Sequence, residues 1–215
     1  MTRNYYVVCL ALIVICFAAA AILYPYLPSR VPIHWNIHGQ VNGYGGKWTL
    51  LAVLPGQMLV IVALMAVISW LSPRQFEVES FRSTYLYIMV AIVAFLAYLH
   101  ALMLWAAVSG PIDMNRAFLG GTCLLMALLG NVMGKVQRNF FIGIRTPWTL
   151  ADERVWHATH RLGAKTMVLG GLTGLVFALA GARPWLCFGA VLVGVFVPVI
   201  YSLVYYKQLE RRGEV

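Results

Sequence analysis

The chain has 215 residues, of which 61% are hydrophobic and only 11% are charged, and its formal net charge is +9. A soluble domain of this length needs polar outer faces, so this composition excludes an ordinary soluble protein, and the excess apolar surface must face lipid. No soluble domain remains that could carry a large nucleic-acid-binding surface, so we expect no direct nucleic-acid partner, and basic loops beside anionic lipid account for the charge.

Six apolar runs are long enough to cross about 30 Å of hydrocarbon as helices. Their length and uniform hydrophobicity do not fit the short alternating strands of a membrane β-barrel. The first run could resemble a cleaved signal peptide, but it extends too far and ends in tyrosines, as a membrane anchor does. The sequence therefore predicts an all-α integral membrane protein, a bundle of about six transmembrane helices at residues 5–26, 49–71, 84–108, 117–132, 166–182 and 185–206.

Lysine and arginine concentrate in loops on one side of this bundle, and such loops are usually cytoplasmic. The outer segments hold only Arg30, Lys47, Arg116 and Arg183. The inner segments hold the other twelve of the 16 basic residues: Arg3, Arg74, Arg82, Lys135, Arg138, Arg145, Arg154, Arg161, Lys165, Lys207, Arg211 and Arg212. We therefore expect both termini in the cytoplasm and residues 28–48 outside.

The outer segment reads VPIHWNIHGQVNGYGGKW over residues 31–48, with alternating apolar and polar residues that predict a half-buried edge strand. On a strand His34 and His38 would lie about 13 Å apart, too far for one zinc ion. Asn42-Gly43 is a strong turn signal, and Gly39 and the glycines after Gly43 also fit tight turns. Two interpretations stay open: a hairpin lying on the membrane surface, with Trp35, Tyr44 and Trp48 at the headgroups, or a recognition surface for something outside the cell.

The inner segment, residues 130–165, is the second polar concentration in the chain. We expect a structured loop from Asn139 to Thr149, in which Gly143 supplies a positive φ and Pro147 precedes a helix start. Thr149 and Asp152 resemble a helix N-cap pair, which predicts a short helix over about residues 150–162 that ends near Arg161.

On that short helix Glu153, His157 and His160 would share one face, and three such groups can bind a metal. The alternative, which we favour, is an interfacial helix whose polar face is solvated and whose Val155, Trp156 and Leu162 face the membrane. The chain has no H-E-x-x-H, G-x-S-x-G or G-x-x-x-x-G-K motif, so no catalytic residue, metal site or cofactor is predicted.

Several residues within the apolar runs have packing roles. We favour a neutral His100 that hydrogen-bonds across the bundle over a functional intramembrane site. Gly130-x-x-x-Gly134 and Gly170-x-x-x-Gly174 should let helices approach closely. The four cysteines show no C-x-x-C spacing, and they are predicted to be small apolar fillers.

Two segments together resemble the SdpI-type family of membrane immunity proteins. The outer one matches a P-x-H-x-N-x-x-G core followed by lysine, at Pro32, His34, Asn36, Gly39 and Lys47. The inner one is similar to the signature after that family's fourth helix, at Gly130, Asn131, Lys135, Asn139, Gly143, Arg145, Thr146, Pro147, Trp148, Trp156, His160 and Gly163. The six-helix layout agrees, so the resemblance covers nearly the whole chain.

The resemblance implies a bacterial cytoplasmic-membrane protein, not an enzyme, that protects its cell against a secreted, membrane-active peptide toxin. It also implies that a small soluble transcriptional repressor could be captured at the membrane. The toxin would meet His34, Asn36 and Lys47 outside, and the inner signature loop would be shaped by Asn139, Arg145, Trp148, Trp156 and His160. Arg145 is expected to face the partner, or else to pair with Asp152 or Glu153.

We expect the chain to divide into two parts. Residues 1–72 form a helix pair with the outer Pro/His/Gly-rich loop, and residues 73–215 form a four-helix part with the SdpI-like inner signature. Two other classes of function stay open. A small proton- or metal-dependent transporter or membrane enzyme would use His100 or the face with His157 and His160. A structural subunit of a larger membrane complex is the third.

Overall fold

A computed structural model describes residues 2–72, 78–110 and 112–215 of the chain. In these ranges six helices are long and apolar enough to cross a membrane. The shortest, with 20 residues, is about 30 Å long at 1.5 Å per residue. The all-α fold with six spans is confirmed: α1 (Thr2–Leu23), α2 (Trp48–Leu71), α3 (Arg82–Val108), α4 (Met114–Met133), α6 (Glu153–Leu179) and α7 (Pro184–Arg211).

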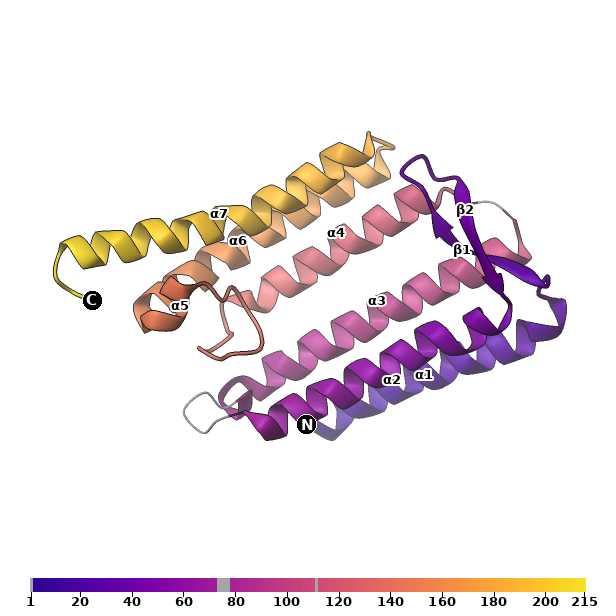
Figure 1. The fold of residues 1–215 in the computed structure, drawn as a ribbon, viewed down its shortest axis with the longest axis horizontal. Coiled ribbons are helices and arrows are strands. Elements are labelled where there is room, and N and C mark those ends of the chain that lie inside the picture. The colour runs from indigo at the N-terminus through magenta and orange to yellow at the C-terminus, as the bar shows by residue number, and fades with distance from the viewer. Residues whose placement is uncertain (1, 73–77, 111) are drawn as a thin grey trace.

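The six helices run back and forth side by side in two groups of three (Figure 1). The helices α1, α2 and α3 pack together, α6 packs against α4 and α7, and the groups meet where α3 lies beside α4. The division at residue 72 stays a prediction, and the inner Arg74 lies outside the described residues.

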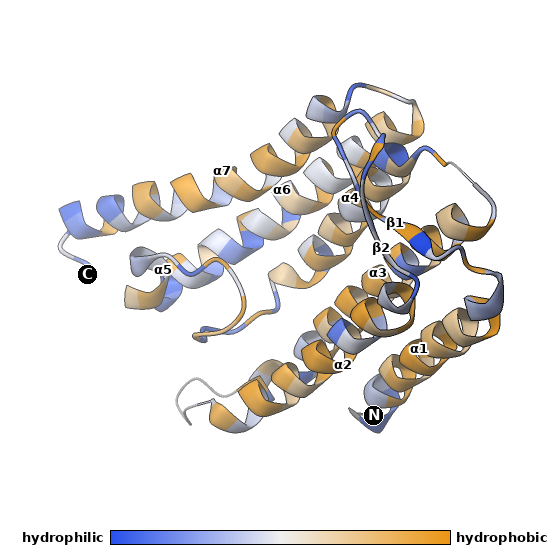
Figure 2. Ribbon diagram, turned by 45° about the vertical axis from the view of Figure 1, so that its right-hand side comes forward, coloured by the Kyte–Doolittle hydropathy of each residue, from blue (hydrophilic) through white to orange (hydrophobic). Residues whose placement is uncertain are grey.

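Shorter elements lie at the two ends of the bundle. One end carries η1 (Tyr24–Tyr26) and the antiparallel hairpin of β1 (Arg30–Trp35) and β2 (Val41–Gly46). The opposite end carries both termini, η3 (Val78–Phe81) and α5 (Pro147–Ala151) (Figure 1). Figure 2 shows that the long helices are mainly hydrophobic, whereas hydrophilic residues gather at the hairpin and at the ends of the bundle. The two ends are therefore the places where polar chemistry is available.

The predicted inner helix is not a separate element. The structure begins α6 at Glu153 and continues it without interruption to Leu179, so Arg161 lies inside a long helix and not in the last turn of a short one. A backbone helix continues through polar residues as long as its hydrogen bonds are made, and the prediction placed a boundary where only the hydropathy changed. The result is a rigid connection between the inner loop and the fifth span.

Polar side chains join α3 to α2 inside the first group of helices. The buried His100 ring contacts the Leu50 carbonyl through Nε2 at 2.7 Å, and the buried Tyr85 hydroxyl donates to the Met65 carbonyl at 2.7 Å. The prediction that His100 hydrogen-bonds across the bundle is confirmed. In a layer without water such bonds satisfy polar groups and fix the register of the two helices.

Small residues hold α4 and α6 together, and two of the glycines predicted to allow close helix approach, Gly130 and Gly174, lie at this contact. A Cβ on Gly130 would lie 2.8 Å from the Met167 Cβ, and one on Gly171 would lie 2.6 Å from the Ala127 nitrogen. The four cysteines are buried and unbonded, which confirms that they are fillers, and the Cys123 sulfur occupies the space beside Gly174. These contacts fix the position of α6, and with it the inner loop.

Candidate ligand and partner surfaces

The outer hairpin is an ordered structure, and the Asn36 side chain makes the hydrogen bonds that form its turn. The Asn36 side-chain oxygen accepts from the His38 and Gln40 nitrogens at 2.9 and 3.0 Å, and its amide donates to the Gln40 side chain. Gly39 closes the turn with φ +77°. The prediction of a turn at Asn42-Gly43 was wrong, because the Asn36 side chain closes the loop earlier and leaves both residues in β2.

The side chains of His34 and Asn42 meet on the exposed side of the hairpin, where the strand register pairs His34 with Gly43. The His34 Nδ1 is 2.5 Å from the Asn42 side-chain oxygen, and Gly43 lies directly under the histidine. The register between β1 and β2 shifts on both sides of His34. The regular alternation of apolar and polar residues predicted for this strand is therefore interrupted at His34. His34 and His38 lie on different parts of the hairpin, one in β1 and the other in the turn.

Lys47 anchors the hairpin to the end of the first helix. Its ammonium lies 4.4 Å from the centre of the Tyr24 ring and donates to the Tyr24 carbonyl at 3.4 Å. On the side of the hairpin that faces the helices, Val31 is fully buried in a cluster with Ala20 and Leu50. Lys47 therefore positions the hairpin, whereas Tyr44 in β2 and Trp48 at the start of α2 remain exposed.

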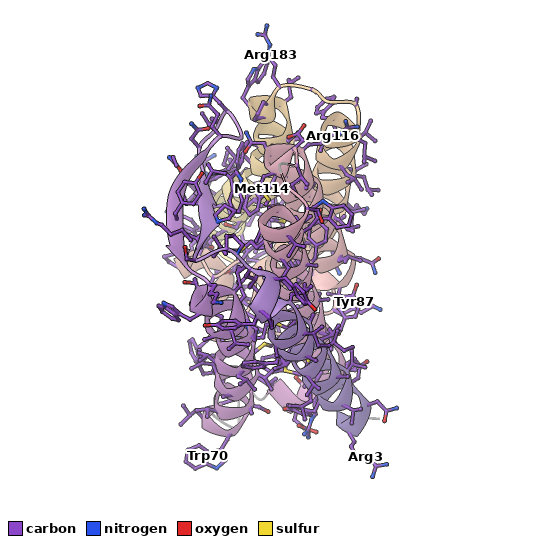
Figure 3. All side chains as sticks on the ribbon, turned by 90° about the vertical axis from the view of Figure 1, so that its right-hand side faces the viewer. Arg3, Trp70, Tyr87, Met114, Arg116 and Arg183 are labelled. Atoms are coloured by element: carbon purple, nitrogen blue, oxygen red, sulfur yellow. The ribbon has the colours of Figure 1, made fainter. Side chains whose placement is uncertain are left out.

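The hairpin tip covers a cavity of about 390 Å³ at the beginning of α4. The Asn115 amide donates to the Ile37 carbonyl, and Arg116 donates to the Leu179 carbonyl at the end of α6. Figure 3 shows Arg116 and Arg183 projecting at the same end of that view, away from Arg3 and Trp70. Sequence reasoning missed this cavity, although Asp113, which caps α4 by accepting from the Arg116 nitrogen, is a recognisable helix-start signal.

An apolar groove of about 560 Å³ continues from this cavity along the seam between the two groups of helices. Asp113 and Arg116 line both spaces. Below them the groove is walled by small residues of α3 and α4, including Ala94, Ala117 and Gly120, and by Phe95. The outer end thus offers a polar chamber that is joined to an apolar surface inside the membrane-spanning part.

The inner loop is organised around Asn139, which is fully buried. Its amide donates to the Gln137 and Ile142 carbonyls at 2.8 and 3.0 Å, and its oxygen accepts from the Phe141 and Ile142 nitrogens at 2.7 and 2.8 Å. The side chain is therefore saturated with hydrogen bonds, so it shapes the loop and has no free donor for a ligand.

Trp156 and His160 form the second part of this structure. Both are fully buried, and their rings stack with centroids 4.0 Å apart. The His160 Nε2 accepts from the Ile144 nitrogen at 3.0 Å, so its Nδ1 carries the proton that is donated to the Trp156 carbonyl at 2.8 Å. The Trp156 indole donates to the Val136 carbonyl at 2.8 Å.

This arrangement changes two of the sequence interpretations. The expectation that Val155 and Trp156 face the membrane was wrong, since both are fully buried, and Trp156 packs in one cluster with Phe141 and Ile142 of the inner loop. Glu153 and His157 are 3.5 Å apart, but His160 uses both ring nitrogens inside the protein and cannot join them as a ligand. The prediction that Glu153, His157 and His160 share one face of a helix was correct. The inner loop, however, covers the end of that face that carries His160.

The inner loop ends at the N-terminus of α5, whose capping residue differs from the one predicted from the sequence. Thr146, and not Thr149, caps α5, and the two threonines form a reciprocal capping box. The buried Thr149 hydroxyl also donates to the Ile144 carbonyl at 2.8 Å, and the Thr146 hydroxyl lies 3.2 Å from that of Ser202 on α7. Gly143 has φ +111°, as predicted. The loop is thereby attached to α6 and α7 alike.

Charged groups at the inner end pair differently from the expectation. Arg145 is exposed and its guanidinium donates to the Phe140 carbonyl, not to Asp152 or Glu153. Asp152 caps α6, and the hydrogen bond from the Arg154 side chain, supported by backbone N–H groups, lowers the pKa of its carboxyl. Trp148, which follows Pro147 at the start of α5, is half-buried. Of the expected inner site residues, Arg145 is thus the one whose charge faces outward.

The fold and these two polar ends define a multi-pass, all-α membrane protein with a structured hairpin at one end and a structured loop at the other. The model of the SdpI/YfhL protein family matches residues 135–202, and that of a domain of unknown function (DUF1648) matches residues 11–59. The chain is 27% identical over 209 residues to the immunity protein SdpI of Bacillus subtilis (strain 168), covering 93% of this chain and 96% of that protein.

The chain is thus similar to the SdpI/YfhL family, through the family model over residues 135–202 and through the SdpI protein over most of its length. The family match begins at Lys135, beside the inner loop, and ends at Ser202, which contacts the loop through Thr146. The second match covers the hairpin and the adjoining parts of α1 and α2. No solved structure matches the chain significantly.

Proposed function

We propose that this protein is a bacterial membrane immunity protein that protects its cell against a secreted, membrane-active peptide toxin. The observation that carries the proposal is the similarity to the SdpI immunity protein, which extends over 93% of the chain and includes both polar ends. The proposed action is binding and involves no catalytic step.

The outer face is proposed to meet the toxin. The hairpin presents the exposed His34 and His38, while Asn36 and Lys47 hold it in place through the contacts described above. A peptide that acts on membranes has an apolar part and a polar part. The cavity under the hairpin, joined to the apolar groove between α3 and α4, offers complementary surfaces for both.

The inner loop is proposed to serve a soluble partner, such as a transcriptional repressor. Its exposed Arg145 is carried on a loop that Asn139 and His160 make rigid, which suits recognition of an acidic surface. Toxin binding outside could influence this loop only if it stabilised one arrangement of the helices over another.

The test is survival of a toxin-sensitive bacterium that lacks its own immunity gene, expressing this chain and exposed to increasing amounts of a secreted Sdp-type toxin peptide. We expect protection by the wild type, loss of protection with Lys47→Ala, and retention with Lys47→Arg, which keeps a cation over Tyr24. Arg145→Ala should still protect. Membrane levels are checked by blotting, and absence of protection by well-expressed wild type would contradict the proposed function.

A further inference from the structure

A hollow of about 460 Å³ lies on the side of the bundle near the end that carries the termini. Ala158, Arg161, Leu162 and Lys165 line it from one face of α6, because residues three and four apart share a helix face. Gly134, just after α4, and Tyr201 on α7 form its sides. Neither the family resemblance nor the proposed function uses this hollow.

The hollow contains two positive charges that no carboxylate neutralises. Arg161 and Lys165 are exposed, and within residues 2–72, 78–110 and 112–215 neither side chain makes a hydrogen bond or an ion pair. Two other basic residues of this end, Arg154 and Lys207, differ because each pairs with a carboxylate. The hollow therefore favours an anion.

The hollow lies at the edge of the hydrocarbon layer. The helix α4 has 20 residues, about the thickness of that layer, and Gly134 follows its last residue directly. Tyr201 stacks on Tyr205 with ring centroids 5.6 Å apart, and tyrosines are typical of the membrane interface. An anion at this depth would be at the level of the lipid phosphates.

We propose that this hollow binds the phosphate headgroup of an anionic phospholipid from the leaflet on the side of the termini. Arg161 and Lys165 would contact the phosphate, and Leu162 and the Tyr201 ring would lie along the lipid chain. Small residues at Gly134 and Ala158 provide the space. A protein partner is disfavoured because a stable protein interface needs about 800 Å² per side, far more than this hollow presents.

The experiment measures lipid retention by the full-length protein, purified in detergent with equal amounts of phosphatidylglycerol and phosphatidylcholine, using native mass spectrometry. We expect preferential retention of phosphatidylglycerol by the wild type. Each basic residue beside an anionic lipid contributes roughly fivefold, so the double substitution Arg161→Gln/Lys165→Gln should weaken retention by about 25-fold. The matched control, Arg211→Gln/Arg212→Gln, removes the same charge outside the hollow and should change retention little.

A second variant tests whether the space of the hollow is needed in addition to its positive charge. Ala158→Leu leaves both basic residues in place but fills the space, so it should also lose phosphatidylglycerol, with its folding checked by the thermal unfolding midpoint. Equal losses in the two charge variants, or no loss with Ala158→Leu, would overturn the proposal. Displacement of bound phosphatidylglycerol by glycerol phosphate alone would also overturn it, since the site would then be one for a soluble phosphate.

Discussion

At the scale of single residues, the signature positions divide into those that build the protein and those that face outward. Asn139, Trp156 and His160 are buried with their polar atoms paired internally, so their chemistry maintains the inner loop. Asn36 has the same role in the outer turn. Recognition is left to exposed neighbours such as Arg145.

Gly143 provides a test of this division. Its backbone has φ +111°, and a Cβ there would collide with the His160 Nε2. Gly110 also has a positive φ, +95°, but a Cβ there meets nothing within 4 Å. Both alanine variants carry the backbone strain of about 1–2 kcal/mol, and only Gly143→Ala adds a steric cost of roughly 1–3 kcal/mol.

We therefore expect Gly143→Ala to lower the thermal unfolding midpoint more than Gly110→Ala, and to expose residues 136–150 to limited proteolysis. Equal behaviour of the two variants would show that His160 does not pack against this glycine as described.

At the scale of elements, the position of the inner loop depends on the contact between α4 and α6. Gly171 faces the α4 backbone, where a Cβ would lie 2.6 Å from the Ala127 nitrogen and 2.7 Å from the Cys123 carbonyl oxygen. Backbone atoms cannot rotate away as a flexible side chain can, so a methyl group there must separate the helices.

Gly171→Ala should accordingly destabilise the protein by about 1–3 kcal/mol. Gly189→Ala on α7 is the matched control, because nothing lies within 4 Å of its added Cβ. Thermal unfolding in detergent measures both, and a Gly171→Ala variant as stable as Gly189→Ala would contradict the close approach of α4 and α6.

At the scale of the whole molecule, the six antiparallel spans bring both termini to the end opposite the hairpin (Figure 1). Most basic residues gather at the end with the termini, so the hairpin should lie outside the cell. This orientation is part of the proposed function, because a secreted toxin reaches the hairpin only from outside.

Cysteine labelling in intact cells tests the orientation. Tyr44→Cys, on a residue that is 54% exposed in the hairpin, should react with a membrane-impermeant maleimide. Arg211→Cys, at the end of α7, should react only after permeabilisation. The wild type provides the background, since its four cysteines are buried. The reverse pattern would place the hairpin in the cytoplasm and remove the proposed toxin-facing role.

The sequence by itself determined the six spans, the extended outer segment and the positive φ at Gly143, because these follow from hydropathy and from the backbone preferences of neighbouring residues. The glycine spacing also indicated that helices would approach closely at Gly130 and Gly170, but not which helices would meet there. These are local properties, or properties of one helix face.

Only the tertiary structure decided which of the polar residues are available to a ligand. The turn of the hairpin lies at the residues around Asn36 and not at Asn42-Gly43, where the sequence predicted it. Trp156 and His160 are buried in contact with the inner loop. The cavity beside Asn115 and the hollow with Arg161 are made by several elements each. The physical reason is that exposure depends on which faces meet, and residues distant in the sequence determine those contacts.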